Sequence, residues 1–250
     1  MPIIFEKVWK SFGDLEVIRG LDLEIADNES LVILGRSGGG KSVLLKLALG
    51  ILSPDKGRII ADDEDINKIP LKELYKLRQR FGMLFQGAAL FDSLTIWENV
   101  AFTLIEHEHK KMDEVMPLVH EKLAMVGMPD IEYKYPAELS GGMKKRVGLA
   151  RAIASNPKYL LYDEPTTGLD PIMADVINEL IIKMNKELKT TSISVTHDIV
   201  SAYKVGTRLV MLYDGVIIWS GTPEETRKSD NPYVQQFITG SSTGPIEMIT

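Results

Sequence analysis

Apolar residues recur along the chain with two different periods, which predicts a mixed α/β fold. Residues 3–9 and 17–25 alternate apolar and polar positions, the pattern of strands with one buried face. Residues 31–34 form a continuous apolar run, as expected of a strand buried on both faces. Residues 43–48 carry apolar side chains at helical spacing and end before Gly50. A strand, a glycine-rich loop and a helix therefore follow one another.

The same strand signal returns several times, interrupted by one helical stretch. Short apolar runs predict further buried strands at residues 58–61, 81–85, 159–162, 192–195 and 208–212. Between Gln86 and Asn156 strand signals are absent, and helical spacing dominates at residues 97–106, 113–126 and 141–155. Asp214-Gly215 lies between two apolar runs and predicts a late hairpin. The pattern indicates a largely parallel sheet with an inserted helical region.

Composition narrows the class of protein. The 250 residues are 44% hydrophobic and 26% charged, which is typical of one compact α/β body. A net charge of −6 argues against a nucleic-acid partner. No window approaches the roughly 18 consecutive apolar residues of a spanning helix, and the start lacks a signal-peptide pattern. The absence of cysteine excludes disulfides and thiolate metal sites, and the four histidines have no ligand spacing. Cytoplasm is the default compartment.

A phosphate-binding loop lies between the predicted strand at 31–34 and the helix that follows it. Gly35-Arg-Ser-Gly-Gly-Gly-Lys-Ser42 fits the pattern G-x-x-x-x-G-K-[ST]. Glycines let backbone amides surround a triphosphate at a helix N-terminus, Lys41 adds a charge to its β- and γ-phosphates, and Ser42 offers a hydroxyl to Mg²⁺. The predicted ATP-binding residues here are Gly35, Ser37, Gly38, Gly39, Gly40, Lys41, Ser42 and Val43. The alternative is a glycine-rich turn with a surface lysine.

Two carboxylates follow the apolar strand predicted at 159–162. Asp163 and Glu164 are placed at the carboxyl end of a strand, which is where α/β sheets bind phosphate groups. Asp163 suits a role in holding hydrated Mg²⁺, and Glu164 can polarise an attacking water. A solvated turn is the alternative.

A second candidate anion site begins at Leu139-Ser-Gly-Gly-Met143. The helix predicted after it carries Lys144, Lys145, Arg146 and Arg151, so its N-terminus is expected to attract a phosphate. One ATP rarely needs two such sites in a chain. The alternative is a serine that only caps a helix.

Taken together, these motifs and their order resemble the ATP-binding cassette (ABC) family over nearly the whole chain. The resemblance implies a P-loop NTPase (RecA-like) core at residues 1–86 and 156–221, with an antiparallel β portion. It further implies an α-helical subdomain at residues 87–155 and a C-terminal helix and tail at residues 222–250.

The resemblance also implies roles for single residues. Ser140, Gly141 and Gly142 match the signature that contacts the γ-phosphate of ATP held by the other subunit, although Met143 replaces its glutamine. Phe12 matches the aromatic residue that stacks on adenine, and Gln86 matches the Q-loop residue that reaches Mg²⁺ and faces the transmembrane partner. Asp170 matches the D-loop residue that links two active sites, and His197 matches the switch histidine. Glu164, Gln86 and His197 are therefore the candidate catalytic residues, and Ser42, Gln86 and Asp163 the candidate Mg²⁺ ligands. For Phe12 and His197, a core aromatic and a structural hydrogen-bonding histidine are the alternatives.

Three classes of ABC protein compete: a transporter ATPase, a DNA-repair or chromosome-structure ATPase, and a translation factor. Repair and chromosome members insert long coiled coils between loop and signature, whereas the interval from Lys41 to Ser140 is short and has no sustained heptads. Translation factors normally carry two cassettes, and this chain has one. The transporter class is favoured.

Within the transporters, several segments are similar to the MCE-associated branch, typified by the Mla system. They are residues 35–46, 85–100 and 139–143 and the tail at 232–237 and 243–246. This resemblance implies a homodimeric ATPase at the cytoplasmic face of the inner membrane, under transmembrane permease subunits. It also implies a periplasmic MCE-domain subunit, a small STAS-type accessory protein, and phospholipid transport that maintains outer-membrane asymmetry. The alternative is the ATPase of a polar amino-acid importer.

The tail at residues 229–250 is predicted to strap two copies of the chain together. Tyr233, Val234, Phe237 and Ile238 give a short helix with one apolar side, which cannot be stable alone. A flexible spacer follows at residues 239–244, and a second apolar stretch follows at residues 245–249. The alternative is a tail packed on its own subunit.

Overall fold

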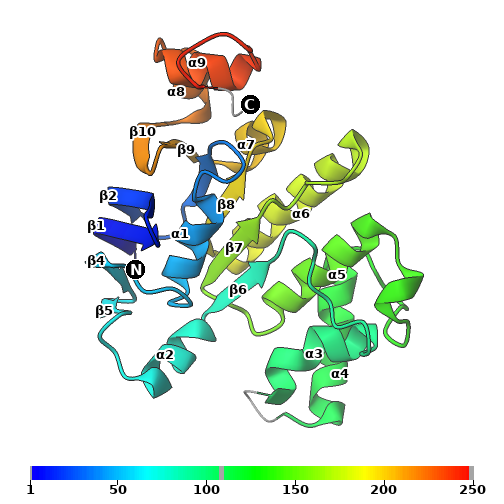
Figure 1. Cartoon of the computed structure of the whole chain (residues 1–250). Coiled ribbons are helices and arrows are strands. Elements are labelled where there is room, and N and C mark those ends of the chain that lie inside the picture. The colour runs from blue at the N-terminus through cyan, green and yellow to red at the C-terminus, as the bar shows by residue number, and fades with distance from the viewer. Residues whose placement is uncertain (1, 107–109, 248–250) are drawn as a thin grey trace. The chain divides into compact units, whose positions relative to one another are not determined.

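The chain forms an α/β fold whose elements fall into two compact units (Figure 1). The computed structural model describes residues 2–106 and 110–247. Unit 1 consists of Met1–Leu74 and Ile193–Thr250, and unit 2 of Tyr75–Ser192. Each unit has its own strands, helices and buried apolar residues.

Unit 1 contains an antiparallel sheet with the strand order β2-β1-β4-β5. Its strands are β1 (Ile3–Phe12), β2 (Leu15–Ile25), β4 (Lys56–Ala61) and β5 (Glu64–Asp65). Ile3 of β1 lies opposite Ile25 of β2 on one side and opposite Ala61 of β4 on the other. The two strands predicted at residues 3–9 and 17–25 are confirmed, and both extend further because Ser11 and Phe12 of β1 pair with Glu16 and Leu15 of β2.

The expectation that residues 58–61 form a buried strand of the parallel sheet is wrong. β4 pairs antiparallel with β1, and its first three residues are exposed. Only Ile59 and Ala61 of this strand are fully buried. A four-residue apolar run does not distinguish a strand with one buried face from a strand with two, so its partner could not be predicted.

A parallel part of unit 1 is built around β3 (Ser30–Leu34), which is buried along its whole length. β3 pairs in parallel with β9 (Arg208–Tyr213), and β9 pairs antiparallel with β10 (Val216–Gly221). The φ angles of Asp214 and Gly215 are 50° and 78°, the left-handed pair of a tight hairpin turn. The predicted hairpin is confirmed. The other elements here are α1 (Lys41–Ala48), α7 (Ile199–Val205) and β8 (Thr191–Thr196), which crosses the boundary between the units.

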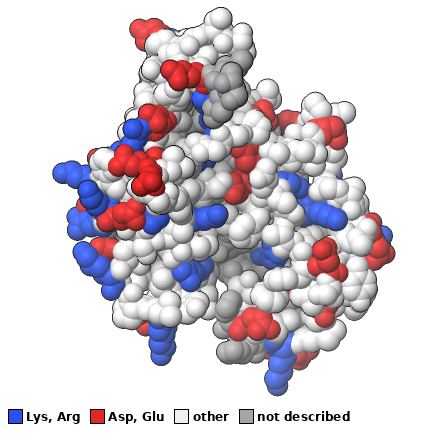
Figure 2. All heavy atoms as spheres, viewed as in Figure 1, with Lys and Arg blue, Asp and Glu red and all other residues white. Residues whose placement is uncertain are grey.

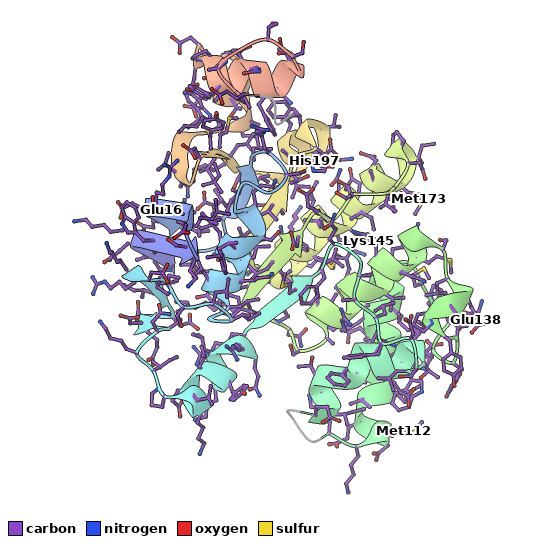
Figure 3. All side chains as sticks on the ribbon, in the orientation of Figure 1. Glu16, Met112, Glu138, Lys145, Met173 and His197 are labelled. Carbon is purple, nitrogen blue, oxygen red and sulfur yellow. The ribbon has the colours of Figure 1, made fainter. Side chains whose placement is uncertain are left out.

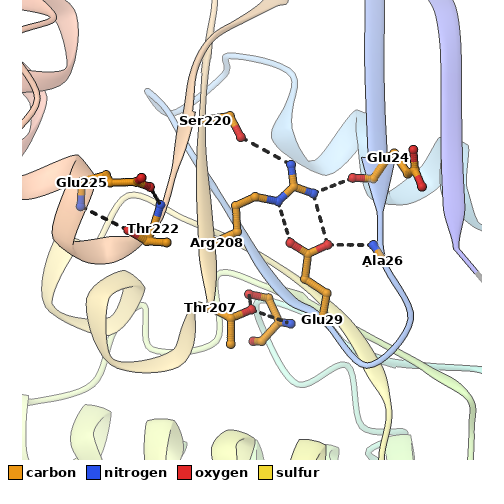
Figure 4. A network of polar contacts seen from close by, with 9 residues as sticks. Glu24, Ala26, Glu29, Thr207, Arg208, Ser220, Thr222 and Glu225 are labelled. Carbon is orange, nitrogen blue, oxygen red and sulfur yellow. Dashed lines mark hydrogen bonds and ion pairs between the residues drawn. The ribbon is translucent and has the colours of Figure 1, made fainter.

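Arg208, the first residue of β9, ties that strand to the turn between β2 and β3 (Figure 4). Its Nε donates to Glu29 Oε1 at 2.5 Å, and its Nη2 donates to Glu29 Oε2 at 3.1 Å. Nη2 also donates to the Glu24 carbonyl, and Nη1 donates to Ser220 Oγ at 3.4 Å. Glu29 Oε2 accepts a further hydrogen bond from the Ala26 amide at 2.7 Å. This bidentate ion pair closes the turn and fixes the start of β9.

The C-terminal helices pack on strands of their own unit. They are α8 (Pro223–Arg227) and α9 (Pro232–Thr239). Val234 of α9 is buried in a cluster with Met211 and Ile246. Gln236 holds the chain that follows α9, because its Oε1 accepts from the Ile246 amide at 2.6 Å and its Nε2 donates to the Ile246 carbonyl at 3.2 Å. The tail is therefore folded back on itself.

This packing bears on the predicted strap at residues 229–250. Up to residue 247, the apolar side chains of the tail pack against β9 and β10 of the same chain. The alternative of a tail on its own subunit therefore describes the structure of a single chain. Residues 248–250 of the predicted tail lie outside the described residues, and a strap between two copies stays a prediction.

Unit 2 is built on two parallel strands, β6 (Phe81–Leu84) and β7 (Tyr159–Asp163). The described residues from 87 to 155 form helices and loops without a strand. These helices are α3 (Ile96–Glu106), α4 (Met112–Met125), η1 (Pro136–Glu138) and α5 (Gly141–Ile153), while α2 (Leu71–Arg78) precedes β6 and α6 (Pro171–Leu188) follows β7. The three helices expected from the periodicity are confirmed, and the division into core and helical subdomain stays a prediction.

Helix α5 lies unusually close to β6. A Cβ atom added to Gly82 would lie 2.0 Å from the carbonyl oxygen of Ala152, so only glycine lets the helix backbone approach the strand this closely. Next to this contact the rings of Phe81 and Tyr159 stack at 4.6 Å between centroids, across β6 and β7. The helix that begins with the predicted signature is thus seated directly on the strand that precedes Gln86.

Figure 2 shows charged side chains of both signs on one face of the chain. On the face that Figure 2 shows, basic and acidic side chains are interspersed over the antiparallel strands of unit 1. Within residues 2–106 and 110–247, none of the helices combines the length and the apolar character that crossing a membrane requires.

Candidate active site

The predicted phosphate-binding loop connects β3 to α1 in unit 1, and its glycines are needed where they stand. A Cβ atom at Gly35 would lie 2.5 Å from the backbone oxygen of Leu212, and one at Gly40 would lie 2.9 Å from Val17 Cγ1. Gly38 and Gly40 have φ angles of 77° and 91°, which side-chain-bearing residues avoid. The local sequence therefore produces the turned backbone that an anion-binding loop requires.

Lys41 lies inside this loop rather than on the surface. Its side chain is 5% exposed, and its Nζ donates to the carbonyls of Gly35 and Arg36 at 2.8 and 2.9 Å. Helix α1 has no side-chain cap and no acidic residue in its first turn. Ser42 and Val43 are half-buried at this helix start, and Ser37 and Gly38 are exposed. A surface lysine beside a glycine turn does not describe this arrangement.

Phe12 and His197 are both accessible in unit 1. Phe12 ends β1, is 47% exposed, and has the Lys10 ammonium 5.5 Å from its ring centroid. The alternative of a core aromatic is therefore wrong. His197 is exposed between β8 and α7, where the next residue, Asp198, caps α7 by accepting from the Val200 amide at 3.0 Å (Figure 3).

The acidic pair lies in unit 2, at the end of β7. Asp163 is the last residue of that strand and is half-buried. Glu164 is only 8% exposed and has a left-handed φ of 49°. Its Oε2 accepts a hydrogen bond from Thr167 Oγ1 at 3.1 Å. A solvated turn does not describe Glu164, because its carboxylate is buried and held.

Lys145 is a residue whose place the sequence did not reveal. It lies on α5, is 5% exposed, and its Nζ donates to the backbone carbonyl of Glu164 at 3.2 Å (Figure 3). Burial lowers the pKa of Lys145, and the charges of Asp163 and Glu164 oppose that shift. We expected Lys145 to contribute to an anion-binding helix start, whereas it points inward and supports the backbone of the acidic pair.

The predicted signature residues open helix α5 in the way that an N-cap does. Ser140 Oγ accepts from the Met143 amide at 3.3 Å, so the alternative of a capping serine is present in the structure. Ser140 and Gly141 are nevertheless exposed. A Cβ atom at Gly142 would lie 2.7 Å from Met173 Cε, which makes a side chain there costly.

Asp170 likewise caps a helix. Its Oδ1 accepts from the amides of Ile172 and Met173, both at 3.0 Å, at the start of α6. The residue is exposed, as a contact with a second chain would require.

Gln86 is exposed and follows β6 by two residues. Arg151 was also assigned to the anion-binding helix start, and that expectation is wrong as well. Its guanidinium donates to the carbonyls of Ala88 and Ala89, which follow Gln86.

A hollow of about 540 Å³ adjoins this segment of unit 2. Its lining includes Tyr75, Phe85, Phe91 and Arg151. The first three are exposed aromatic side chains. An apolar hollow of this kind on one unit is suited to binding part of another molecule.

Within the described ranges, no group of three or more His, Asp or Glu side chains could hold a metal by itself. A Mg²⁺ ion bound to proteins usually keeps waters and takes one or two carboxylates together with substrate phosphates.

Comparison with known proteins tests the family. The family model described as ABC transporter matches residues 18–167. The chain is 44% identical over 239 residues to the "Probable ribonucleotide transport ATP-binding protein mkl" of Mycobacterium tuberculosis, covering 96% of this chain and 67% of that protein. It is 41% identical over 234 residues to the "Intermembrane phospholipid transport system ATP-binding protein MlaF" of Haemophilus influenzae, covering 94% of this chain and 89% of that protein.

The solved structures agree with this likeness. One of them, described as "Dimeric structure of a post-hydrolysis state of the ATP-binding cassette MJ0796 bound to ADP and Pi", matches with a TM-score of 0.81 and 32% identity. The match covers 88% of this chain and 98% of that one. The predicted fold class and the predicted resemblance are confirmed. The chain belongs to the ABC transporter family, as one of its ATP-hydrolysing cassettes.

Proposed function

We propose that this chain hydrolyses ATP to energise lipid (phospholipid) transport across a bacterial envelope, which maintains the lipid asymmetry of the outer membrane. The observation that carries the proposal is the likeness to MlaF over most of both chains, since the name of that protein states intermembrane phospholipid transport. Amino-acid import, the alternative that the sequence left open, is an outcome of the experiment below.

In the proposed site, the loop from Gly35 to Ser42 binds the phosphates of ATP. Left-handed glycines and an uncapped helix start supply backbone amides, and Lys41 supplies the charge. Lys41 exchanges its two carbonyl partners for phosphate oxygens. Phe12, exposed at the end of β1, stacks on the adenine.

The oxygen donors of the site fit Mg²⁺. The Ser42 hydroxyl, the Gln86 amide and the Asp163 carboxylate are hard ligands of the type this cation prefers. When bound, Mg²⁺ neutralises charge that develops on the phosphate oxygens.

Glu164 is the proposed general base for the attacking water. Its buried carboxylate is oriented by Thr167, and its carbonyl is held by Lys145. His197 contacts the γ-phosphate in this proposal.

The active unit is proposed to be a homodimer. Ser140, Gly141 and Gly142 bind the γ-phosphate held by a second copy, and Asp170 links the two sites. The exposure of Ser140 and Asp170 supports a contact with another chain.

Transmembrane permease subunits are the proposed partners that hold the ATPase at the cytoplasmic face of the inner membrane. The aromatic hollow beside Phe85 is the proposed docking place, since an aromatic surface is suited to an apolar helix. A periplasmic MCE-domain subunit and a small STAS-type protein complete the proposed complex.

The test uses the complex purified from native membranes with either the wild-type chain or Glu164→Gln. We expect Glu164→Gln to retain ATP and to lose hydrolysis by about 10²- to 10⁴-fold, with phospholipid the main small molecule found by mass spectrometry. Glu187→Gln, an exposed glutamate on α6, is the control and should hydrolyse ATP normally. Near-normal ATP turnover in Glu164→Gln would show that Glu164 is not the general base. Bound amino acid, with auxotrophy of a deletion strain, would support the importer instead.

A further inference from the structure

The chain just after Gln86 has a backbone conformation that its residues do not favour. Ala88 and Ala89 have φ angles of 61° and 48°, so two consecutive alanines are left-handed. Residues with a Cβ atom avoid this region, and it persists where surrounding contacts enforce it. Some other part of unit 2 must therefore hold these two peptides in place.

Arg151 of α5 provides that contact. Its Nη1 donates to the Ala89 carbonyl and its Nη2 donates to the Ala88 carbonyl, both at 2.6 Å. The planar guanidinium spans two adjacent carbonyls with two donors, which a lysine ammonium on a flexible stem does not reproduce. Both bonds involve a charged donor and are therefore stronger than ordinary amide hydrogen bonds.

The position of Arg151 is itself fixed. The neighbouring residue of α5, Ala152, has its carbonyl against Gly82 of β6, where no side chain fits. One turn earlier, a Cβ atom on Gly148 would lie 3.3 Å from the Ala88 Cβ and 2.8 Å from Leu84 Cδ1. Helix α5 is thus seated against β6 and against the start of the loop, and the guanidinium has little freedom to follow a moving loop.

The far end of the same loop is held by Asn99, which is fully buried on α3. Its Oδ1 accepts from the Phe91 amide at 2.7 Å, and its Nδ2 donates to the Phe91 and Leu94 carbonyls, both at 3.1 Å. The backbone from residue 88 to residue 94 is therefore restrained at both ends by polar side chains. Gln86 itself is exposed, and a Cβ on Gly87 would meet nothing within 4 Å.

We propose that Arg151 is a positioning residue for Gln86: by holding the Ala88 and Ala89 carbonyls, it fixes the direction in which the chain leaves β6 and so the place of the Gln86 side chain. This inference rests on the proposed role of Gln86 as a ligand of the nucleotide-bound Mg²⁺. Arg151 itself touches neither nucleotide nor metal in this proposal. Its effect passes entirely through the backbone of residues 87–89.

The first test needs no nucleotide. Hydrogen exchange of the full chain, followed by mass spectrometry of peptides covering residues 86–95, reports how often this backbone opens. Arg151→Met should raise exchange there at least severalfold while peptides from α4 stay unchanged. Arg151→Lys, which keeps the charge but loses the fork, should give an intermediate increase. Arg227→Met, which removes an exposed arginine of α8, is the control and should leave this segment unchanged. Unchanged exchange in Arg151→Met would overturn the proposal.

The second test separates this inference from the proposed function. We expect Arg151→Met to lower kcat by about tenfold to 100-fold, the scale of a small misplacement, to raise the Mg²⁺ concentration for half-maximal rate, and to leave ATP affinity unchanged. The double variant Arg151→Met with Gln86→Ala should be no slower than Gln86→Ala alone. If Gln86→Ala has normal turnover, the proposed role of Gln86 fails. If Gln86→Ala is slow and the arginine variant multiplies that loss, Arg151 acts by another route and the inference fails.

Discussion

The ion pair between Glu29 and Arg208 allows a quantitative prediction about unit 1. Glu29→Gln keeps the shape of the side chain but places an amide against the guanidinium. The carboxylate accepts three hydrogen bonds, two from Arg208 and one from the Ala26 amide. The side chains of Arg208 and Glu29 are 30% and 12% exposed, between the surface and the buried extremes.

Exposed ion pairs contribute about 0–1 kcal/mol, and breaking a fully buried pair costs about 3–5 kcal/mol. The intermediate exposure and bidentate geometry place the loss in Glu29→Gln at about 2 kcal/mol. For a chain of this length such a loss lowers Tm by roughly 4–8 °C. Glu24→Gln is the matched control, because only the backbone carbonyl of Glu24 contacts Arg208 and its side chain is exposed. The control should change stability by less than about 0.5 kcal/mol.

The assay is urea unfolding followed by tryptophan fluorescence in a Trp97→Phe background, so that the signal comes from Trp9 and Trp219 of unit 1. A double-mutant cycle of Glu29→Gln with Arg208→Met should give a coupling energy above about 1 kcal/mol. A coupling energy below about 0.5 kcal/mol would refute the reasoning, since the pair would then behave as an ordinary surface contact.

Three further predictions concern unit 2. Lys145→Met should slow ATP hydrolysis, because the backbone of Glu164 loses the hydrogen bond from the Lys145 ammonium; the adjacent Lys144→Met is the control, and equal rates in the two variants would contradict the assignment. Gly82→Ala should destabilise the chain by at least about 3 kcal/mol, measured by thermal unfolding, because the added carbon meets a helix carbonyl at 2.0 Å. Hydrogen bonds from the Thr95 hydroxyl and amide hold the pKa of Glu98 below its ordinary value of 4.5. That stabilisation is present above pH 4.5 and is lost as the pH falls through the lowered pKa, so Glu98→Gln should flatten the acid side of the stability–pH curve.

Elements whose formation depends only on residues close together in the sequence were predictable. The continuous apolar run before Gly35, the glycines and the helical spacing after Lys41 are local signals, and β3, the loop and α1 follow them. The Asp214-Gly215 hairpin is equally local. The sheet to which residues 58–61 belong is decided by pairing with β1, far away in the chain, and no local pattern contains that information.

The same distinction between local sequence signals and contacts with distant segments applies to the site residues. Motif residues such as Lys41 and Glu164 could be proposed as site residues because their chemistry requires a fixed spacing. Lys145 and Arg151 were misassigned, because whether a long basic side chain faces solvent or a buried carbonyl depends on which side of α5 packs against β6. Asn99 gave no signal, since an asparagine inside a helix differs from a surface one only through its partners.

The internal contacts of Lys41 change what a binding measurement on this loop would mean. In this structure the Lys41 ammonium donates to the Gly35 and Arg36 carbonyls. In the proposed site, phosphate oxygens replace these carbonyls, so binding exchanges one set of hydrogen bonds for another. The affinity lost in Lys41→Ala then measures the difference in free energy between lysine bonded to phosphate and lysine bonded to the two carbonyls. It underestimates the direct attraction between ammonium and phosphate. Calorimetry should accordingly give a smaller favourable enthalpy for ATP than the number of polar contacts in the complex suggests.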